Sequence, residues 1–241
     1  IATTSSVTDA TPASFAAHVS LRLCEDPDTM LDIRISDIPV GECPADLKSR
    51  GGMGSIAEQL AQSRLDVLLG GGAGHFAPAA EGETASVADL ARRNGFELVT
   101  SGSQLASASA DKKLLGLFAP DELPLRLRGE DGREAESPRP SLLNRLHPYL
   151  GSVTFPETMR CEPNPDYGQT PSLRQMTDAA LKHLSHDNHK GFFLMIESAS
   201  IDKQAHERKP CGSIGELEQL EEALASALEF AHKHPNTLVM V

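Results

Sequence analysis

Short, mainly apolar runs alternate with segments of helical periodicity along this chain, and this alternation restricts the folds that the chain can adopt. An uninterrupted apolar run is typical of a strand buried on both faces, and strands that alternate with helices predict a parallel sheet covered on both sides. We therefore expect an α/β fold with a mostly parallel central sheet sandwiched between helices. The predicted strands are residues 65–69, 96–99, 114–118, 192–196 and 237–241.

Helix start signals lie between these strands. Thr11 and Pro12 are typical of an N-cap and a first helical position, in a helix that we expect to end near Arg22. Ser55 and Glu58 form a capping-box pattern that begins a helix through about residue 63. Further helices are expected over 86–93, from the Thr-Pro pair at 170–171 through residue 184, and over 214–231.

Two stretches lack this periodicity. Residues 24–52 are irregular and rich in Asp, Pro and Gly, which is typical of a long surface loop. Residues 126–160 gain charge, Gly and Pro, and we interpret them as a loop or insertion region. We expect residues 1–241 to form a single, partial domain, because nothing indicates a second core.

The composition restricts the possible partners. With 241 residues and 39% hydrophobic content, the chain can bury a substantial core. Its formal net charge of -12 argues against nucleic-acid binding, which depends on Lys and Arg, and an acidic surface repels anionic membranes. No apolar stretch approaches the roughly 20 residues that cross a bilayer. We therefore expect neither a nucleic acid nor a membrane as a partner.

The four cysteines, Cys24, Cys43, Cys161 and Cys211, are widely spaced and include no C-x-x-C pair. Two disulfides in an exported protein explain this pattern better than four free thiols, although the sequence allows three connectivities. No signal peptide is visible, and the chain begins at Ile1 rather than Met. We therefore expect a processed product or an excerpt of a longer protein that is periplasmic or secreted.

A metal site is indicated near residue 200. Glu197 is the first charged residue after the apolar run 192–196, and Asp202 and His206 are four positions apart. On a helix, residues i and i+4 point the same way, so the two side chains can reach one ion. Imidazole nitrogen and carboxylate oxygen both suit zinc, whereas a carboxylate such as Glu197 can also bind magnesium.

Several stretches in the same order resemble bacterial alkaline phosphatases. They include DATPASFAAHVSLRLC at 9–24, DVLLGGGAGHFAP at 66–78, FFLMIESASIDKQAH at 192–206, PCGSIGELEQLEEA at 210–223 and the terminal NTLVMV. The resemblance extends over nearly the whole chain. It implies a large sheet between helices and hydrolysis of phosphate monoesters through a phosphoserine intermediate, with two zinc ions and one magnesium ion.

The resemblance also implies roles for single residues. Asp202 and His206 match ligands of the first zinc, and Glu197 and Thr11 match magnesium ligands. Arg22 matches the arginine that binds the phosphate. Asp9 and Lys203 match positions that hold waters between the metals and the phosphate.

Other parts of the family pattern fall outside the chain. The serine nucleophile is expected upstream of Ile1, and further metal ligands are expected after Val241. We therefore expect the isolated segment to be inactive. The resemblance further implies a homodimer of the intact protein, and we expect the sequential disulfides Cys24–Cys43 and Cys161–Cys211, which would close loops worth roughly 3 and 4 kcal/mol.

Two alternatives remain. Residues 72–77 formally satisfy G-x-G-x-x-A after a strand, as in dinucleotide-binding oxidoreductases, although Pro78 would disturb the helix that must face the pyrophosphate. The other alternative is an exported domain that binds metal or phosphate without catalysis.

Overall fold

The computed structural model describes residues 1–35 and 37–241. At its centre lies a five-stranded sheet in the order β11-β1-β4-β6-β5, in which every neighbouring pair is parallel. The strands are β1 (Ala2–Ser6), β4 (Val67–Gly71), β5 (Phe96–Val99), β6 (Lys113–Leu117) and β11 (Ile196–Glu197). The expectation of a parallel α/β sheet is therefore confirmed.

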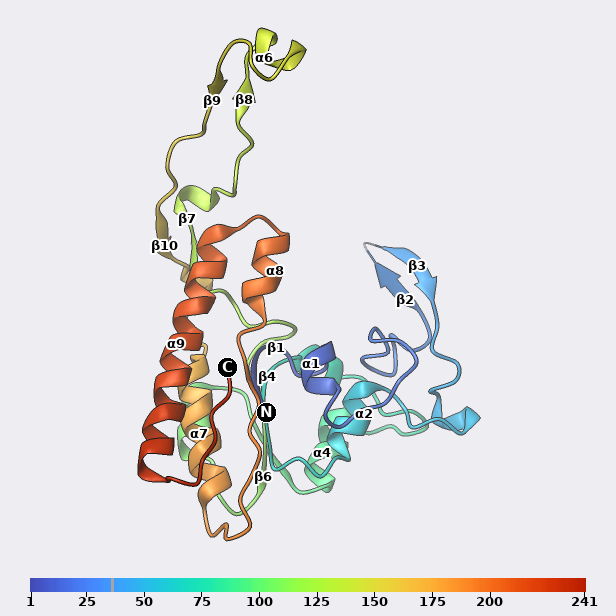
Figure 1. The fold of residues 1–241 in the computed structure, drawn as a ribbon. Helices are drawn as coiled ribbons and strands as arrows, with labels where there is room; N and C mark the ends of the chain where they lie inside the picture. Colours follow the sequence, from blue (N-terminus) through green and yellow to red (C-terminus); the bar gives the residue numbers. More distant parts are fainter. Residues whose placement is uncertain (36) are drawn as a thin grey trace.

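Helices cover both faces of this sheet (Figure 1). The two faces follow from the alternation of side chains along each strand. Leu68 packs with α2 (Ile56–Ala61) and α4 (Val87–Arg93), whereas Val67 and Leu69 pack on the other side with α7 (Leu173–Ser185) and α9 (Pro210–Lys233). The sheet thus lies between two separate apolar cores, and the predicted sandwich is present.

Smaller elements surround these layers. Three antiparallel pairs are β2 (Ile33–Ile35) with β3 (Ile38–Gly41), β7 (Leu127–Gly129) with β10 (Cys161–Pro163), and β8 (Arg139–Pro140) with β9 (Val153–Thr154). The short helices are α1 (Ala10–Ala13), η1 (Lys48–Arg50), α3 (Ala73–Phe76), α5 (Gly102–Ser107), η2 (Glu130–Gly132), α6 (Leu142–Leu146), η3 (Pro165–Tyr167) and α8 (Ser200–His206). Among the described residues, no helix is both long and apolar enough to cross a membrane.

The segment between β7 and β10 extends away from the sheet and carries β8, α6 and β9 at its far end (Figure 1). Large apolar side chains in it are exposed, including Leu142 at 81% and Leu146 at 78%. This part of the chain falls within the 126–160 region. Its interpretation as an insertion in a single domain stays a prediction.

Both disulfides have the expected sequential pairing, Cys24–Cys43 and Cys161–Cys211. The first belongs to a small core of its own with Met30 and Ile33. The described residues of 24–52 therefore form more than a plain surface loop, because this core includes Ile33 of β2. The second joins β10 to the start of α9.

Two predicted helix starts are wrong. The first helix begins after Asp9, whose side chain accepts a hydrogen bond from the Ala10 N–H, and it ends at Ala13. Arg22 therefore lies in the loop beyond this helix rather than near its end. The N-cap of α7 is Ser172, which forms a capping box with Gln175, instead of the preceding Thr-Pro pair.

The two predicted strands nearest the C-terminus also differ. Of the former, predicted over 192–196, only Ile196 joins the sheet, where it forms the two-residue edge strand β11 with Glu197 and pairs with Ala2 of β1. Phe193 is 72% exposed and lies beside Phe15, with ring centroids 5.6 Å apart. Residues 237–241 form no strand; three of their apolar side chains are exposed, namely Leu238, Met240 and Val241.

The buried face of α9 is not formed by its large apolar residues. Leu217 and Leu228 are about half exposed, at 51% and 52%. The helix instead buries small and polar residues: Gly212, Gly215, Glu216, Gln219, Ala223 and Ser226. The small residues allow close packing against neighbouring elements, which an apolar pattern does not reveal.

Candidate metal and phosphate site

The candidate site lies at the carboxyl ends of the parallel strands, where open α/β sheets bind their ligands. After β1 comes Asp9, after β4 comes His75, and after β6 come Asp121 and Glu122. Strand β11 ends at Glu197 and leads into α8. Residues far apart in sequence are therefore brought to one edge of the sheet.

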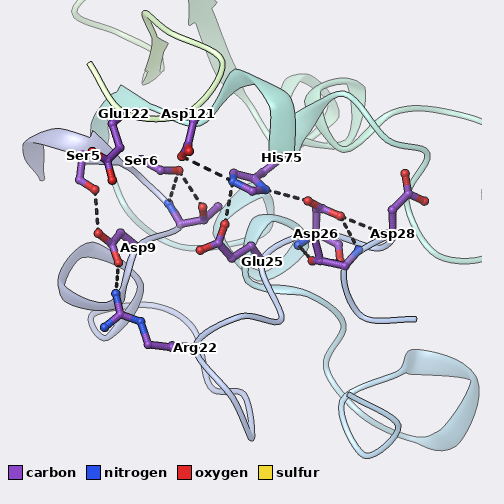
Figure 2. A network of polar contacts seen from close by, with 12 residues as sticks. Ser5, Ser6, Asp9, Arg22, Glu25, Asp26, Asp28, His75, Asp121 and Glu122 are labelled. Carbon is purple, nitrogen blue, oxygen red and sulfur yellow. Dashed lines mark hydrogen bonds and ion pairs between the residues drawn. The ribbon is translucent and has the colours of Figure 1, made fainter. Parts of the chain in front are cut away.

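Asp9 is the centre of an ion-pair network, and Figure 2 shows its contacts with Ser5 and Arg22. Its Oδ1 accepts a hydrogen bond from Nη2 of Arg22, and its Oδ2 lies 2.7 Å from Nζ of Lys203. The hydroxyl of Ser5 donates to the same Oδ2 at 2.7 Å and accepts from Lys203 at 2.7 Å. Three predicted site residues thus meet, with one carboxylate between two cations.

Exposure and pKa values differ along this network. The side chain of Asp9 is 15% exposed, whereas that of Arg22 is 64% exposed and can approach a ligand from solvent. Burial by itself would raise the pKa of Asp9, but hydrogen bonds from Lys203, Ser5 and the Ala10 backbone outweigh it and hold the pKa below its usual range. Burial would lower the pKa of Lys203, yet its carboxylate partners raise it. Asp9 and Lys203 are therefore both charged at neutral pH.

Glu122 is a site residue that sequence reasoning missed. Its Oε1 accepts a hydrogen bond from Nζ of Lys203, which lies 81 positions away in the sequence. The residue follows Pro120 and Asp121 in an irregular loop, where a carboxylate is usually a solvated surface group. No local signal in the sequence could have identified it.

The triple glycine at the end of β4, of which Gly70 and Gly71 belong to the strand, explains how this loop reaches the site. A Cβ on Gly71 would lie 1.7 Å from the Asp121 carbonyl oxygen, so only glycine allows this approach. The N–H groups of Gly72 and Gly74 then donate to the carbonyls of Asp121 and Pro120, each at 2.7 Å. The glycines hold a neighbouring loop, and α3 is only four residues long. The dinucleotide-binding interpretation of 72–77 is therefore not supported.

A second polar cluster surrounds His75 at the rim of the site (Figure 2). Its Nδ1 lies 2.7 Å from Oδ2 of Asp26, and its Nε2 lies 2.7 Å from Oε2 of Glu25. Burial alone would lower the pKa of His75, but the two carboxylates raise it to about 10. The imidazolium therefore joins α3 to the loop that follows Arg22 and Cys24.

This cluster makes stability depend on pH. Because the folded-state pKa of His75 is near 10 and an unfolded histidine titrates near 6.5, its contribution is complete below about pH 6.5 and is lost as the pH rises through about 10. We expect His75→Gln in the intact protein to remove about 2 to 4 kcal/mol of unfolding free energy at pH 6 but much less at pH 10.5. Urea titrations at both pH values measure this difference.

The exposed His18 supplies the control for this experiment. His18→Gln removes a histidine without touching the cluster, so its unfolding free energy should follow the wild type at both pH values. An equal loss of stability at pH 6 and pH 10.5 in His75→Gln would contradict the ion-pair account.

Asp202 and His206 lie together on α8, as the spacing predicts. Oδ1 of Asp202 is 3.6 Å from Nε2 of His206, and both side chains are at least 80% exposed. Two ligands about 2.0 to 2.1 Å from a tetrahedral zinc ion are about 3.3 to 3.4 Å apart, so this pair fits one ion with little adjustment. The pair alone is an incomplete ligand set.

In the part of the chain that the structure describes, only one group of three potential ligands has its ligand atoms within 4.8 Å: Cys24, Cys43 and Asp46. The two cysteines form a disulfide, so neither provides a thiolate. This group is therefore no metal site, and Asp202 and His206 would need ligands from elsewhere.

The two predicted magnesium ligands, Glu197 and Thr11, differ from one another in their surroundings. Oε2 of Glu197 accepts a hydrogen bond from Oγ1 of Thr3 at 2.7 Å, which orients the carboxylate at the end of β11. Thr11 is exposed on α1, and its hydroxyl makes no hydrogen bond among the described residues. Thr11 is thus outside the network that joins Asp9, Arg22 and Lys203.

Sequence comparison decides the family. The family model "Alkaline phosphatase" matches residues 1–241. The chain belongs to the alkaline phosphatase family. The alkaline phosphatase of Escherichia coli is 42% identical over 245 residues, which cover 99% of this chain and 46% of the relative. Streptomycin-6-phosphate phosphatase of Streptomyces griseus is 41% identical over 253 residues, covering 99% of this chain and 49% of the relative.

Solved alkaline phosphatase structures support the same assignment. The enzyme of the Antarctic bacterium TAB5 superposes with a TM-score of 0.60 at 25% identity, covering 98% of this chain and 49% of that chain. A TAB5 variant with bound magnesium gives a TM-score of 0.59 at 25% identity, with 98% and 48% coverage. This chain therefore spans about half the length of the relatives that it matches.

Proposed function

We propose that the intact protein is a metal-dependent alkaline phosphatase that hydrolyses phosphate monoesters. The observation that carries this proposal is the network of Asp9, Arg22 and Lys203 at the same sheet edge as Glu197 and α8. Two cations held by one partly buried carboxylate form a preorganised anion site, which the overall charge of -12 would otherwise disfavour.

Each side chain of the network has a distinct task. The guanidinium of Arg22 is exposed and can donate hydrogen bonds to two phosphate oxygens at once. A lysine ammonium cannot form this bidentate contact. Asp9 fixes Arg22 and Lys203 relative to one another. Lys203 supplies positive charge beneath the phosphate site from a partly buried position.

Asp202 and His206 would hold zinc, and Glu197 and Thr11 would hold magnesium. When bound, such ions stabilise charge on the attacking and leaving oxygens of an in-line displacement. The ligand types suit these ions, and the Asp202–His206 separation of 3.6 Å supports a shared cation. The nucleophilic serine is proposed to lie outside residues 1–241, so the isolated segment should not turn over substrate.

The substrate, location and assembly are proposals for the intact protein. Phosphate monoesters are the substrate class. Two disulfides support an exported, periplasmic or secreted protein. A homodimer is expected from the family resemblance. If phosphatase activity is absent, binding of metal or phosphate without catalysis becomes the leading function.

Replacing Arg22 tests the phosphate-binding role. Arg22→Lys in the intact protein should lower kcat/KM for p-nitrophenyl phosphate by roughly 10- to 100-fold, because the bidentate contact is lost while the charge remains. Arg93→Lys is the matched control, since Arg93 is exposed on α4 and pairs with Glu83. Equal activity of both variants would reject the assignment of Arg22.

A further inference from the structure

Glu122 contacts Lys203 but has no part in the function proposed above. The ammonium of Lys203 has three N–H donors and three partners: Oγ of Ser5 and Oδ2 of Asp9, each at 2.7 Å, and Oε1 of Glu122. Every donor of Lys203 is therefore committed within the protein. A phosphate group that approaches this site meets an ammonium already neutralised on two sides.

The backbone around Glu122 is fixed rather than loose. Hydrogen bonds hold the loop on both sides of it: Leu123 N–H to Thr4 O at 3.0 Å, Gly72 N–H to Asp121 O at 2.7 Å, and Gly74 N–H to Pro120 O at 2.7 Å. The side chain is 38% exposed, so it also borders solvent at the mouth of the site. The contact with Lys203 is thus built into the packing of the loop against β1 and β4.

The contact between Glu122 and Lys203 changes the net charge of the network. Asp9 and Glu122 carry two negative charges, and Arg22 and Lys203 carry two positive charges, so their sum is zero. Without Glu122 the sum would be +1. A phosphate monoester or inorganic phosphate is an anion, so its affinity depends directly on this balance.

We propose that Glu122 limits the phosphate affinity of the site by neutralising Lys203 and holding its ammonium on Asp9. This inference rests on the function proposed above, because it assumes that phosphate binds beside Arg22 and Lys203. In an enzyme whose product is inorganic phosphate, weaker anion binding favours product release. Glu122 is then a positioning residue that acts through Lys203.

Glu122→Gln removes the charge but keeps the shape of the side chain. In the intact protein, we expect the inhibition constant of inorganic phosphate against p-nitrophenyl phosphate to fall by roughly three- to tenfold, with a parallel fall in KM. The inhibition should also become more sensitive to added salt, because an uncompensated charge is screened by ions. If Glu122 had only a structural role, Glu122→Gln would weaken phosphate binding instead.

Two variants separate charge from contact. Asp121→Asn removes the same charge from the adjacent residue, which is 75% exposed and faces His75, so the inhibition constant should stay within about twofold of the wild type. Glu122→Asp keeps the charge but withdraws the carboxylate from Lys203 by one methylene, so its inhibition constant should lie between those of the wild type and Glu122→Gln. Thermal unfolding of each variant shows that it is folded.

An unchanged or higher inhibition constant in folded Glu122→Gln would overturn the proposal, as would an equal fall in Asp121→Asn. If the wild-type protein hydrolyses no phosphate ester, the proposed function fails first. Calorimetric titration with inorganic phosphate then still tests Glu122: tighter binding by Glu122→Gln than by the wild type supports the inference, and equal or weaker binding contradicts it.

Discussion

In the intact protein, His206→Ala should lose bound zinc and phosphatase activity together. His206 is one of two ligand candidates on α8, with Nε2 only 3.6 Å from Oδ1 of Asp202. Alanine removes a ligand nitrogen and leaves one carboxylate, so kcat should fall at least about 100-fold. Zinc content by atomic emission and hydrolysis of p-nitrophenyl phosphate, measured on the same preparation, check this prediction.

His232→Ala provides the matched control, since His232 is an exposed histidine near the end of α9. It should keep both zinc and activity. Because His206 is 80% exposed, its removal should also leave the unfolding free energy of the metal-free protein within about 1 kcal/mol of the wild type. Full activity with normal zinc content in His206→Ala would reject the ligand assignment.

Gly71→Ala should destabilise the fold by at least about 3 kcal/mol. The added Cβ would lie 1.7 Å from the backbone oxygen of Asp121, a position that cannot be relieved by rotation of a side chain. In the variant, the loop that carries Glu122 would have to move. This movement would strain the hydrogen bonds that the loop accepts from Gly72 and Gly74. Urea unfolding of the intact protein measures the loss.

Gly102→Ala is the control for a glycine replacement. Gly102 is the first residue of α5, and an added Cβ would meet its nearest neighbours only at 3.8 Å. Alanine should therefore be neutral or stabilise by up to about 1 kcal/mol. If Gly71→Ala unfolds at the same urea concentration as the wild type, the close approach of the Asp121 loop is not required.

The sequence predicts those elements whose signals are local. The capping box of Ser55 and Glu58 begins α2 as expected, and β5 (Phe96–Val99) has the bounds of the predicted strand. Strand β1 gives no such signal, because its sequence is ATTSS. Its hydroxyl groups are buried next to the site, where Thr3 bonds Glu197 and Ser5 bonds Asp9. The strand that contacts both Glu197 and Asp9 is thus the least apolar strand of the central sheet.

The errors near the C-terminus have a related cause. An apolar run predicts burial only if other elements cover it, and the run at 192–196 lies at the edge of the sheet. Prediction of the site from the sequence is limited in the same way, because contacts between distant residues have no local signal. The spacing of Asp202 and His206 on one helix can be recognised in the sequence, whereas the contact of Lys203 with Glu122 joins α8 to a loop that approaches it only in the folded chain.

The most direct test of the account is the hydrolysis of p-nitrophenyl phosphate by the intact protein before chelation, after chelation and after zinc and magnesium are restored. We predict activity that disappears when the metals are removed and returns when both are supplied. Activity that persists in the metal-free protein, or no hydrolysis at any metal loading, would contradict a metal-dependent phosphomonoesterase.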